Sequence, residues 1–284
     1  MIRFATGEDH PQLKALWAEI FGDTKDAVEA YFALRHLNEN MLVEEREDTV
    51  AGMLSMLPVT LASSDGQALS ARYIYAVATH PRFRGQGIST ALLEAAHAHM
   101  QGLGDAAAIL VPASASLFDF YGKRGYTTIF SLDVVRFDAK ELPPFPVSGQ
   151  YTACSAGEYA RFRDQAFCKS RLYALWEESA VSYAMQTFCE DGGVTALSWE
   201  GGHGCAAWER TGDGVLVREL ALLRGDIQTA LSVLHKALNA SWYQVRLMEG
   251  TLPGAEKQPF GMIRWLAYEP KLYGDAPYLS LALD

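Results

Sequence analysis

The stretch from Tyr73 to Leu93, YIYAVATHPRFRGQGISTALL, decides the fold of this chain. Its first part is an apolar run of strand length, and its last part has apolar residues at helical spacing. Between them, Gly85 and Gly87 can adopt backbone angles that other residues avoid. The order of strand, glycine turn and helix predicts that successive amide N–H groups meet at the start of the helix, where they have no partner within the helix.

A helix start of this kind binds anions, because its free N–H groups and the positive end of the helix dipole point at the same place. Arg82 and Arg84 add local positive charge to a chain whose formal net charge is −10. Ser89 can donate a hydroxyl hydrogen. We therefore interpret residues 84–89, which we call the cradle, as a binding site for a diphosphate.

Other nucleotide-binding motifs fit this stretch less well. The dinucleotide motif G-x-G-x-x-G would need a glycine where Thr90 stands, and the Gly-Lys-Ser/Thr of a Walker A loop is absent from the stretch. An ordinary glycine-containing turn explains two glycines alone. It does not explain the two arginines and the amphipathic helix that accompany them.

With these residues the chain resembles the GNAT superfamily of acyl-CoA-dependent N-acyltransferases, whose signature is Arg/Gln-x-x-Gly-x-Gly/Ala. Arg82, Gly85 and Gly87 match that signature. The resemblance implies acetyl-CoA as the donor substrate, with its pantetheine arm in a gap where strand 75–79 splays from strand 106–111. The donor-binding residues that it implies are Ala76, Val77, Ala78, Arg82, Arg84, Gly85, Gln86, Gly87, Ile88, Ser89 and Ser116.

A second motif, residues 116–126 (SLFDFYGKRGY), also fits this family. The family typically has a tyrosine on a short helix, followed by Gly-Phe or Gly-Tyr, here Tyr121, Gly125 and Tyr126. A tyrosine, whose reference pKa is about 10, can give a proton to a departing thiolate when it is well placed. The resemblance therefore implies that Tyr121 is the general acid, and core packing in an aromatic cluster is the alternative role.

The attacking amine must be neutral, so a base or a water path is needed. Glu19 and Asp23 lie near the first helix junction, where this family usually builds its acceptor site, and His80 stands beside the cradle. Each of the three could equally be a solvated surface group. The sequence does not select a base.

Strands and helices alternate through both halves of the chain, which predicts an α/β fold with a mixed, splayed central sheet. In the first half we expect strands at 2–6, 41–45, 50–57, 67–79, 106–111 and 126–137, and helices at 10–21, 25–35, 85–101 and 117–124. In the second half we expect strands at 151–155, 194–199, 204–210, 215–222, 244–248 and 278–283, and helices at 158–166, 170–188 and 226–238. The similar order suggests two related folds in tandem.

The proline-rich segment 138–150, DAKELPPFPVSGQ, is the expected linker between the halves, because its prolines cannot continue a helix or a central strand. We expect a catalytic acyl-CoA-binding domain at 1–137 and a degenerate GNAT-like domain at 151–284. Pro112 stands where the family often carries an asparagine after the strand. With this proline and the Tyr-Gly-x-x-Gly-Tyr that follows, the chain resembles the branch of enhanced-intracellular-survival acetyltransferases. That branch has a second, degenerate GNAT fold, and also a sterol-carrier-like third domain whose roles are not transferred to this chain.

The second half lacks a cradle. Its counterpart at 222–226, LLRGD, has one glycine, and Asp226 would repel a diphosphate there. We expect this half to bind no CoA, to cover the first domain and to help form the acceptor pocket. Its aromatic residues could line such a pocket or form a core: these are Trp208, Trp242, Tyr243 and Trp265.

Composition argues against several classes of protein. The net charge of −10 argues against a nucleic-acid partner, and no apolar run reaches the roughly 20 residues that a membrane-spanning helix needs. The N-terminus has no signal pattern, and the four cysteines lack C-x-x-C spacing, so we expect reduced thiols, no metal and a cytoplasmic location. An acidic cleft would suit a cationic acceptor. A homo-oligomer is compatible with the sequence.

Two functions from different classes fit these observations. The first is an N-acetyltransferase that moves an acetyl group from acetyl-CoA to a primary amine of a small molecule or peptide by direct attack. The second is a non-catalytic acyl-CoA-binding regulatory protein. A phosphate-binding protein unrelated to CoA is a third interpretation, which the family order of the two motifs disfavours.

Overall fold

A computed structural model describes residues 1–187 and 192–280. The chain forms two compact units. The first consists of Met1–Leu61, Ala68–Thr128 and Gly261–Pro270, and the second of Ala62–Gln67, Ile129–Phe260 and Lys271–Asp284.

The first unit is a mixed sheet covered by helices. Its elements are β1 (Ile2–Phe4), α1 (His10–Phe21), α2 (Lys25–Leu34), β2 (Met41–Arg46), β3 (Thr49–Ala62), β4 (Ala68–Thr79), α3 (Ile88–Leu103), β5 (Ala107–Leu110) and α4 (Ala115–Gly122). Short 3₁₀ turns occupy Gly7–Asp9, Asn38–Asn40 and Pro81–Phe83. The strands lie in the order β1-β2-β3-β4-β5, and the end of β13 (Glu256–Trp265) follows β5.

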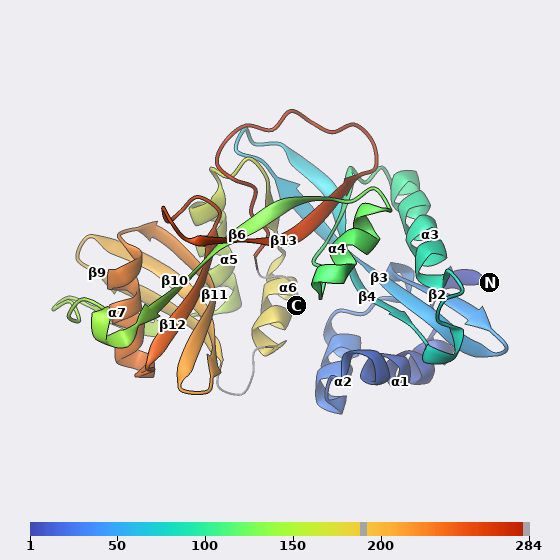
Figure 1. Cartoon of the computed structure of the whole chain (residues 1–284), viewed down its shortest axis with the longest axis horizontal. Helices are drawn as coiled ribbons and strands as arrows, with labels where there is room; N and C mark the ends of the chain where they lie inside the picture. The colour runs from blue at the N-terminus through green and yellow to red at the C-terminus, as the bar shows by residue number, and fades with distance from the viewer. Residues whose placement is uncertain (188–191, 281–284) are drawn as a thin grey trace. The chain divides into compact units, whose positions relative to one another are not determined.

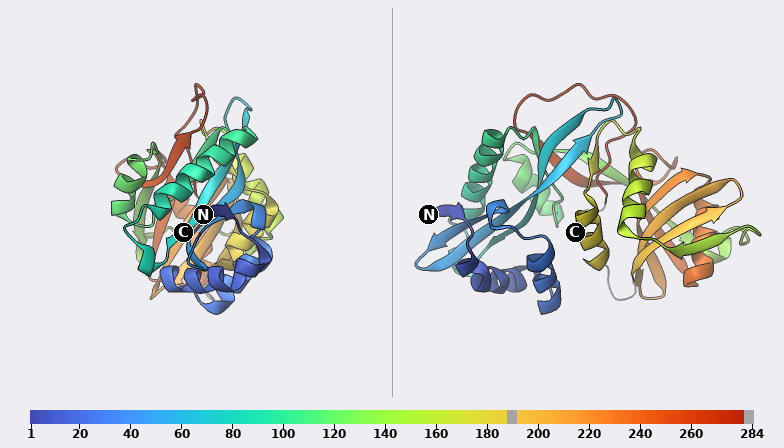
Figure 2. Two further views of the ribbon diagram at one scale, coloured as in Figure 1. Left: turned by 90° about the vertical axis from the view of Figure 1, so that its right-hand side faces the viewer. Right: turned by 180° about the vertical axis from the view of Figure 1, so that it is seen from behind.

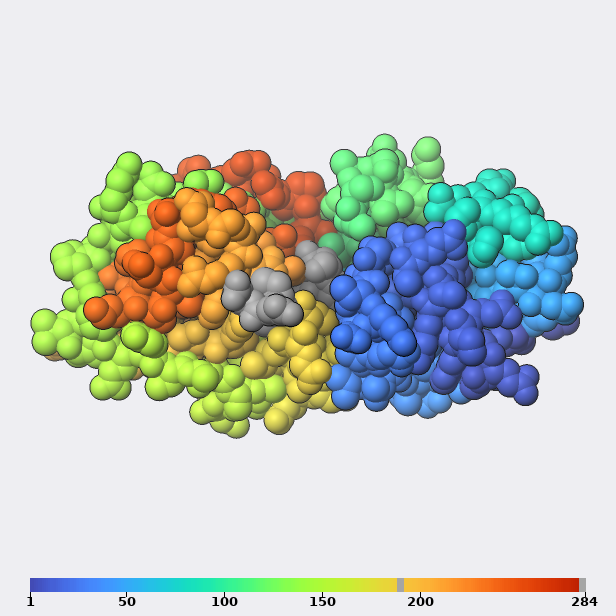
Figure 3. Space-filling model, turned by 90° about the horizontal axis from the view of Figure 1, so that it is seen from below, coloured from blue at the N-terminus to red at the C-terminus, as the bar shows by residue number. Residues whose placement is uncertain are grey.

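Alternation along the strands places α1 and α2 on one face of this sheet and α3 on the other (Figures 1 and 2). Tyr75 of β4 packs against Trp17 of α1, with ring centroids 5.6 Å apart. Its neighbour Ile74 is buried in the same apolar cluster as Leu92 of α3. The α1–α2 pair forms the blue surface that faces the viewer in Figure 3.

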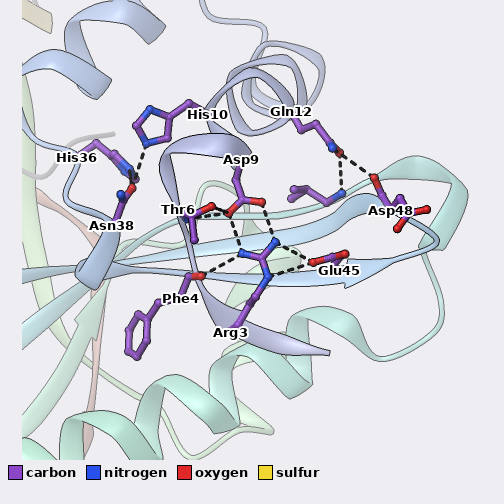
Figure 4. A network of polar contacts seen from close by, with 11 residues as sticks. Arg3, Phe4, Thr6, Asp9, His10, Gln12, His36, Asn38, Glu45 and Asp48 are labelled. Carbon is purple, nitrogen blue, oxygen red and sulfur yellow. Dashed lines mark hydrogen bonds and ion pairs between the residues drawn. The ribbon is translucent and has the colours of Figure 1, made fainter.

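An ionic clamp joins the start of the chain to the sheet and to α1 (Figure 4). Arg3 donates two hydrogen bonds to Asp9, of 2.7 and 2.8 Å, and two more to Glu45 on β2, of 2.8 and 3.0 Å. The paired guanidinium holds the pKa of the Asp9 carboxyl well below its usual range. The side chain of Asp9 also accepts a hydrogen bond from the Thr6 amide, so one carboxylate fixes the turn into α1.

Strands β4 and β5 pair along only part of β4. The two strands pair in parallel only from Ala71–Tyr73 to Ala107–Ile109, although β4 continues to Thr79. Ala76 has φ +50°, a left-handed conformation that an L-residue rarely adopts within a strand. Ala76 thus lies in a part of β4 beyond its pairing with β5.

The second unit has a similar, though not identical, order of elements. Its elements are β7 (Gln150–Ala153), α5 (Ala156–Phe167), β8 (Tyr173–Leu175), α6 (Glu178–Thr187), β9 (Gly193–Trp199), β10 (Gly202–Thr211), β11 (Gly214–Arg224), α7 (Ile227–Leu238) and β12 (Trp242–Met248). The strand order β7-β9-β10-β11-β12 ends in a parallel β11–β12 pair, as β1 to β5 end in a parallel β4–β5 pair. The extra strand is β8.

Each sheet is completed by a strand from the other half of the sequence. Residues Met262–Trp265 of β13 pair antiparallel with β5. Strand β6 (Thr127–Asp138) follows α4 and pairs antiparallel with β12 over Leu132–Asp138. The division between the units therefore falls inside β6, at Thr128/Ile129, and not in the proline-rich segment. That segment carries one 3₁₀ turn, Ala139–Glu141, before β7.

Two expectations about secondary structure are wrong. The sequence did not predict β13, and residues 170–177, expected to begin a helix, contain β8, with α6 starting only at Glu178. In the expected strand 278–283, Tyr278 forms an isolated bridge to Tyr173, while residues 281–283 lie outside the described residues, as does Phe188 at the expected end of its helix. The expected mixed α/β fold is confirmed.

Candidate active site

The cradle has the backbone geometry that its sequence predicts. Gly85 has φ +74°, and Gly87 has φ +78° and ψ 8° as the N-cap of α3. We expected this helix to begin at Gly85. Because of the left-handed angles, α3 begins at Ile88 instead. The amide of Ala91 donates the first bond within the helix, to the Gly87 carbonyl at 3.0 Å, so the N–H groups of the preceding turn stand free of the helix.

Open space surrounds both cradle glycines. A Cβ atom added at Gly85 or Gly87 would meet no heavy atom within 4 Å. Their backbone angles, and not a lack of room, therefore require glycine at these positions. The Cβ side of both glycines is therefore open to a ligand.

The two arginines beside the cradle have different surroundings. Arg82 is exposed, forms an ion pair with Glu47 and lies 5.1 Å from the centre of the Phe83 ring. Arg84 is exposed. The side-chain oxygen of Gln86 accepts a hydrogen bond of 2.8 Å from Arg46. An anion in the cradle would compete with Glu47 for Arg82.

The other predicted donor contacts lie on the elements that flank the cradle. Ala76, Val77 and Ala78 form the part of β4 beyond its pairing with β5. Ser116 is exposed in the first turn of α4, with its hydroxyl 3.1 Å from that of Ser114. Ile88 is buried beneath the first turn of α3, so its amide and not its side chain is available to a ligand.

Tyr121, the predicted acid, lies on α4 with 7% of its surface exposed. Burial raises the pKa of its phenol to about 12, and the nearby positive charge of Arg124 partly offsets that rise. The rings of Phe120 and Tyr126 meet it edge to face, with centroids 5.1 and 5.7 Å away. Within residues 1–187 and 192–280 its hydroxyl has no hydrogen-bond partner. The phenol is therefore protonated at neutral pH and free to donate.

Arg124, which the sequence did not single out, joins α4 to the start of α3. Its guanidinium donates to the Thr90 hydroxyl at 2.5 and 3.2 Å and to the Phe120 carbonyl at 2.6 Å. It also lies 3.5 Å from the centre of the Phe120 ring. The helix that carries Tyr121 is thus fixed to the helix turn that follows the cradle.

A second network behind Tyr121 includes a residue far away in the sequence. Arg264 donates to His97 Nδ1 at 2.9 Å, across 167 residues, and to the Arg124 carbonyl at 2.7 Å. Since an arginine only donates, His97 carries its proton on Nε2, which lies 2.8 Å from the hydroxyl of Tyr126. Burial, with a smaller contribution from Arg264, lowers the pKa of His97 to about 4. The sequence alone gives no signal for this network, because the network depends on the pairing of β13 with β5.

None of the three base candidates is selected by its contacts. His80 Nδ1 accepts a hydrogen bond from the Arg82 amide at 3.2 Å. Asp23 accepts one from the Trp17 indole at 2.7 Å. Glu19 is exposed on α1. The first two side chains hold local structure, and the third faces solvent.

The turn of the second unit that corresponds to the cradle is closed. Asp226 caps α7, as predicted, with its carboxylate accepting from the Thr229 amide at 2.8 Å. A Cβ atom at Gly225 would lie 2.3 Å from the ring of Trp199. This turn thus differs from the cradle in its capping carboxylate and in the close approach of the Trp199 ring.

The aromatic residues of the second half do not line one pocket. Tyr243 is fully buried in the apolar core of the second unit, against which Trp208 packs. Trp242 donates to Asp213. Trp265 belongs to the first unit, opposite Ala107 of β5, so grouping it with the others was wrong.

Other features of the described residues bear on the sequence expectations. Cys154, Cys168 and Cys205 are free thiols, and Cys189 lies outside the described residues. Within residues 1–187 and 192–280, no group of three or more His, Cys, Asp or Glu side chains could hold a metal ion. No helix in that part of the chain is long and apolar enough to cross a membrane.

One family model matches the first part of the chain. Residues 1–129 match the family model described as the acetyltransferase (GNAT) domain. This range contains the cradle, Tyr121, Arg124 and His97, and it ends inside β6. No curated protein matches the chain.

Solved structures share the fold at low sequence identity. A GCN5-related N-acetyltransferase from Anabaena variabilis aligns over 94% of this chain and 73% of its own, with 18% identity and a TM-score of 0.76. A probable N-acyltransferase from Enterococcus faecalis aligns over 94% and 72%, with 13% identity and a TM-score of 0.73. Eis1 from Mycobacterium abscessus aligns over 94% and 74%, with 13% identity and a TM-score of 0.69.

Proposed function

We propose that this chain, whose residues 1–129 match the acetyltransferase (GNAT) domain model, moves an acetyl group from acetyl-CoA to a primary amine of a small molecule or peptide. The observation that carries the proposal is the cradle. Two left-handed glycines turn the amides at the start of α3 toward open space, where a diphosphate can accept their hydrogen bonds.

In this proposal the pantetheine arm lies between β4 and β5, beyond the part where the two strands pair. Beyond Tyr73 the backbone of β4 has no partner on β5, so the amide groups of 76–78 can bond the arm as a neighbouring strand would. The left-handed conformation of Ala76 supports this role, because left-handed strain in a strand is retained where it serves a site.

The proposed reaction is direct attack on the thioester. The amine nitrogen forms a bond to the acetyl carbon, the carbon–sulfur bond breaks, and the sulfur leaves with its electron pair. Tyr121 gives its phenolic proton to that sulfur, which yields the free thiol of CoA. The nitrogen loses its extra proton to water and becomes the amide, and the Tyr121 phenolate regains a proton from water. The raised pKa of about 12 keeps the Tyr121 phenol protonated until the thiolate develops beside it.

We further propose that the second unit is a degenerate copy of the first that binds no CoA. The recurring order of elements and the matching parallel strand pair support common descent. Asp226 would repel a diphosphate at the start of α7. An acidic acceptor site, suited to a cationic amine, is consistent with the net charge of −10.

Release of CoA during incubation with acetyl-CoA and a panel of primary amines tests the proposal. The panel should hold a polyamine, an aminoglycoside and a lysine peptide, with mass spectrometry to detect the acetylated product. Product with at least one amine supports the transferase. Tight acetyl-CoA binding without product across a broad panel would favour the non-catalytic regulator, for which the lack of a selected base is the present argument.

A further inference from the structure

A pocket of about 560 Å³ lies wholly within the first unit. Its walls come from α3, from the turn after α4 and from the end of β13. Thr90 at its edge is the residue directly after the cradle. A ligand group in this pocket would therefore be a neighbour of any diphosphate at the start of α3.

Three cationic side chains and one carboxylate line this pocket. Lys123, Arg124 and Arg264 line it. The two guanidinium groups are half-buried and donate only to neutral acceptors, namely a hydroxyl, backbone carbonyls and the imidazole of His97. Within the described part of the chain none of the three cations forms an ion pair, and Glu94, an exposed carboxylate on the wall, is paired with none of them.

Such cations are unusual in so acidic a chain. Half-buried arginines ordinarily have carboxylate partners, because removing a charge from water is costly unless an opposite charge is near. A guanidinium that is already oriented by neutral acceptors can bond a phosphate with little further ordering. The pocket thus favours a dianion over a neutral ligand.

An aromatic wall narrows the class of ligand. Trp265 is partly exposed and lines the same pocket as the three cations. Aromatic faces of this kind stack on nucleobases, and a volume of about 560 Å³ accommodates a base with its sugar phosphate.

We propose that this pocket binds a phosphomonoester carried on a purine nucleoside. One source is the 3′-phosphoadenosine end of CoA itself, in which case the inference rests on the proposed function and names a donor-specificity subsite. The other source is a free nucleotide. Adjacency to the cradle favours the donor, and Arg264 and Trp265 would then make the second half of the sequence part of the donor site.

Isothermal titration of the full chain with CoA, with 3′-dephospho-CoA and with adenosine 3′,5′-bisphosphate tests the proposal. CoA should bind on the order of tenfold more tightly than dephospho-CoA, the worth of a hydrogen-bonded charge pair. Lys123→Met, at an exposed side chain, should abolish most of that difference and leave dephospho-CoA affinity unchanged. Arg264→Lys should weaken CoA in the same direction, and Lys236→Met, at an exposed lysine of α7, is the matched control.

The outcomes separate the two sources and the two proposals. Bisphosphate binding that excess CoA displaces assigns the pocket to the donor, whereas binding that persists beside saturating CoA, and that Lys123→Met weakens, assigns it to a free nucleotide. Equal affinities for CoA and dephospho-CoA, together with no binding of the bisphosphate, would overturn the inference. These measurements need no turnover. If the chain distinguishes CoA from dephospho-CoA but acetylates no amine, the proposed function is contradicted and the pocket is still supported.

Discussion

At Gly87 a single residue controls both the backbone and the proposed ligand. Its φ of +78° would cost another residue about 1–2 kcal/mol, and a side chain there would point into open space beside the free amides. We expect Gly87→Glu to abolish acetyl-CoA binding, because its carboxylate would lie where a diphosphate binds. Calorimetric titration with acetyl-CoA measures this directly.

The same helix supplies the matched control. Gly104, the C-cap of α3, has φ +80° and equally open surroundings. Gly104→Glu should therefore destabilise the fold by a similar amount while leaving donor affinity unchanged. Equal donor affinity in the Gly87 variant and the wild type would refute the cradle.

Tyr121 is the residue whose two roles can be separated by one oxygen atom. Tyr121→Phe keeps the ring contacts with Phe120 and Tyr126 and removes the proton. We expect kcat to fall at least about a hundredfold, as for loss of a general acid, with the acetyl-CoA dissociation constant unchanged. Steady-state kinetics and titration on the same sample measure both. Wild-type turnover in this variant would leave Tyr121 as a packing residue only.

At the scale of elements, His97 connects α3 to the start of β6 and to β13, and it does so only when neutral. The pKa of His97 is about 4 in the fold, against 6.5 for an unperturbed imidazole. Between pH 6.5 and pH 4 the His97 imidazole is protonated in the unfolded chain but neutral in the folded chain. The free energy of unfolding therefore falls as the pH falls through this window.

We expect His97→Gln to flatten this pH dependence. At pH 4.5 the loss of stability caused by protonation of His97 in the unfolded chain is about 2 to 3 kcal/mol. Urea denaturation of both proteins at pH 7 and pH 4.5 should show a smaller decrease for the variant by that amount. Groups such as Asp9 titrate alike in both proteins and cancel. Parallel decreases would show that His97 is charged in the fold.

Local elements could be predicted from sequence where local chemistry decides them. The α1 helix has the predicted bounds, and the hairpin of β2 and β3 turns at Glu47 and Asp48, whose left-handed angles suit a tight turn. Residues 170–177 have helical spacing, but Tyr173–Leu175 instead form a short strand. There the bridge between Tyr173 and Tyr278 overrides the local helical pattern.

The candidate site divides in the same way. The cradle and Tyr121 belong to continuous motifs, so their residues could be named from the sequence. Arg264 could not, because nothing near it signals that β13 lies beside β5. Pro259 and Gly261 within that strand indicate a turn when only the local sequence is considered.

At the scale of the whole molecule, the exchange of strands makes the two halves of the sequence interdependent. All four residues of β5 are buried, and β13 covers its far edge. A fragment of residues 1–137 lacks β13, Arg264 and the apolar contacts of Met262. We expect this fragment to lose cooperative unfolding and acetyl-CoA binding, as measured by circular dichroism during heating and by calorimetry.

Fragments cut within 142–149 and co-expressed provide the control. They keep β6 and β13 intact, so they should assemble and bind acetyl-CoA with nearly the affinity of the full chain. A fragment of residues 1–137 that unfolds cooperatively and binds the donor alone would show that β13 is dispensable.

The late position of β13 in the chain also matters on the ribosome. At a synthesis rate of roughly 5–20 residues per second, β5 waits on the order of ten seconds for the strand that closes its edge. During that interval a nascent chain exposes one unpaired edge of an apolar strand, which is the kind of surface that chaperones shield. We therefore expect soluble yield in cells to depend on elongation speed and chaperone supply.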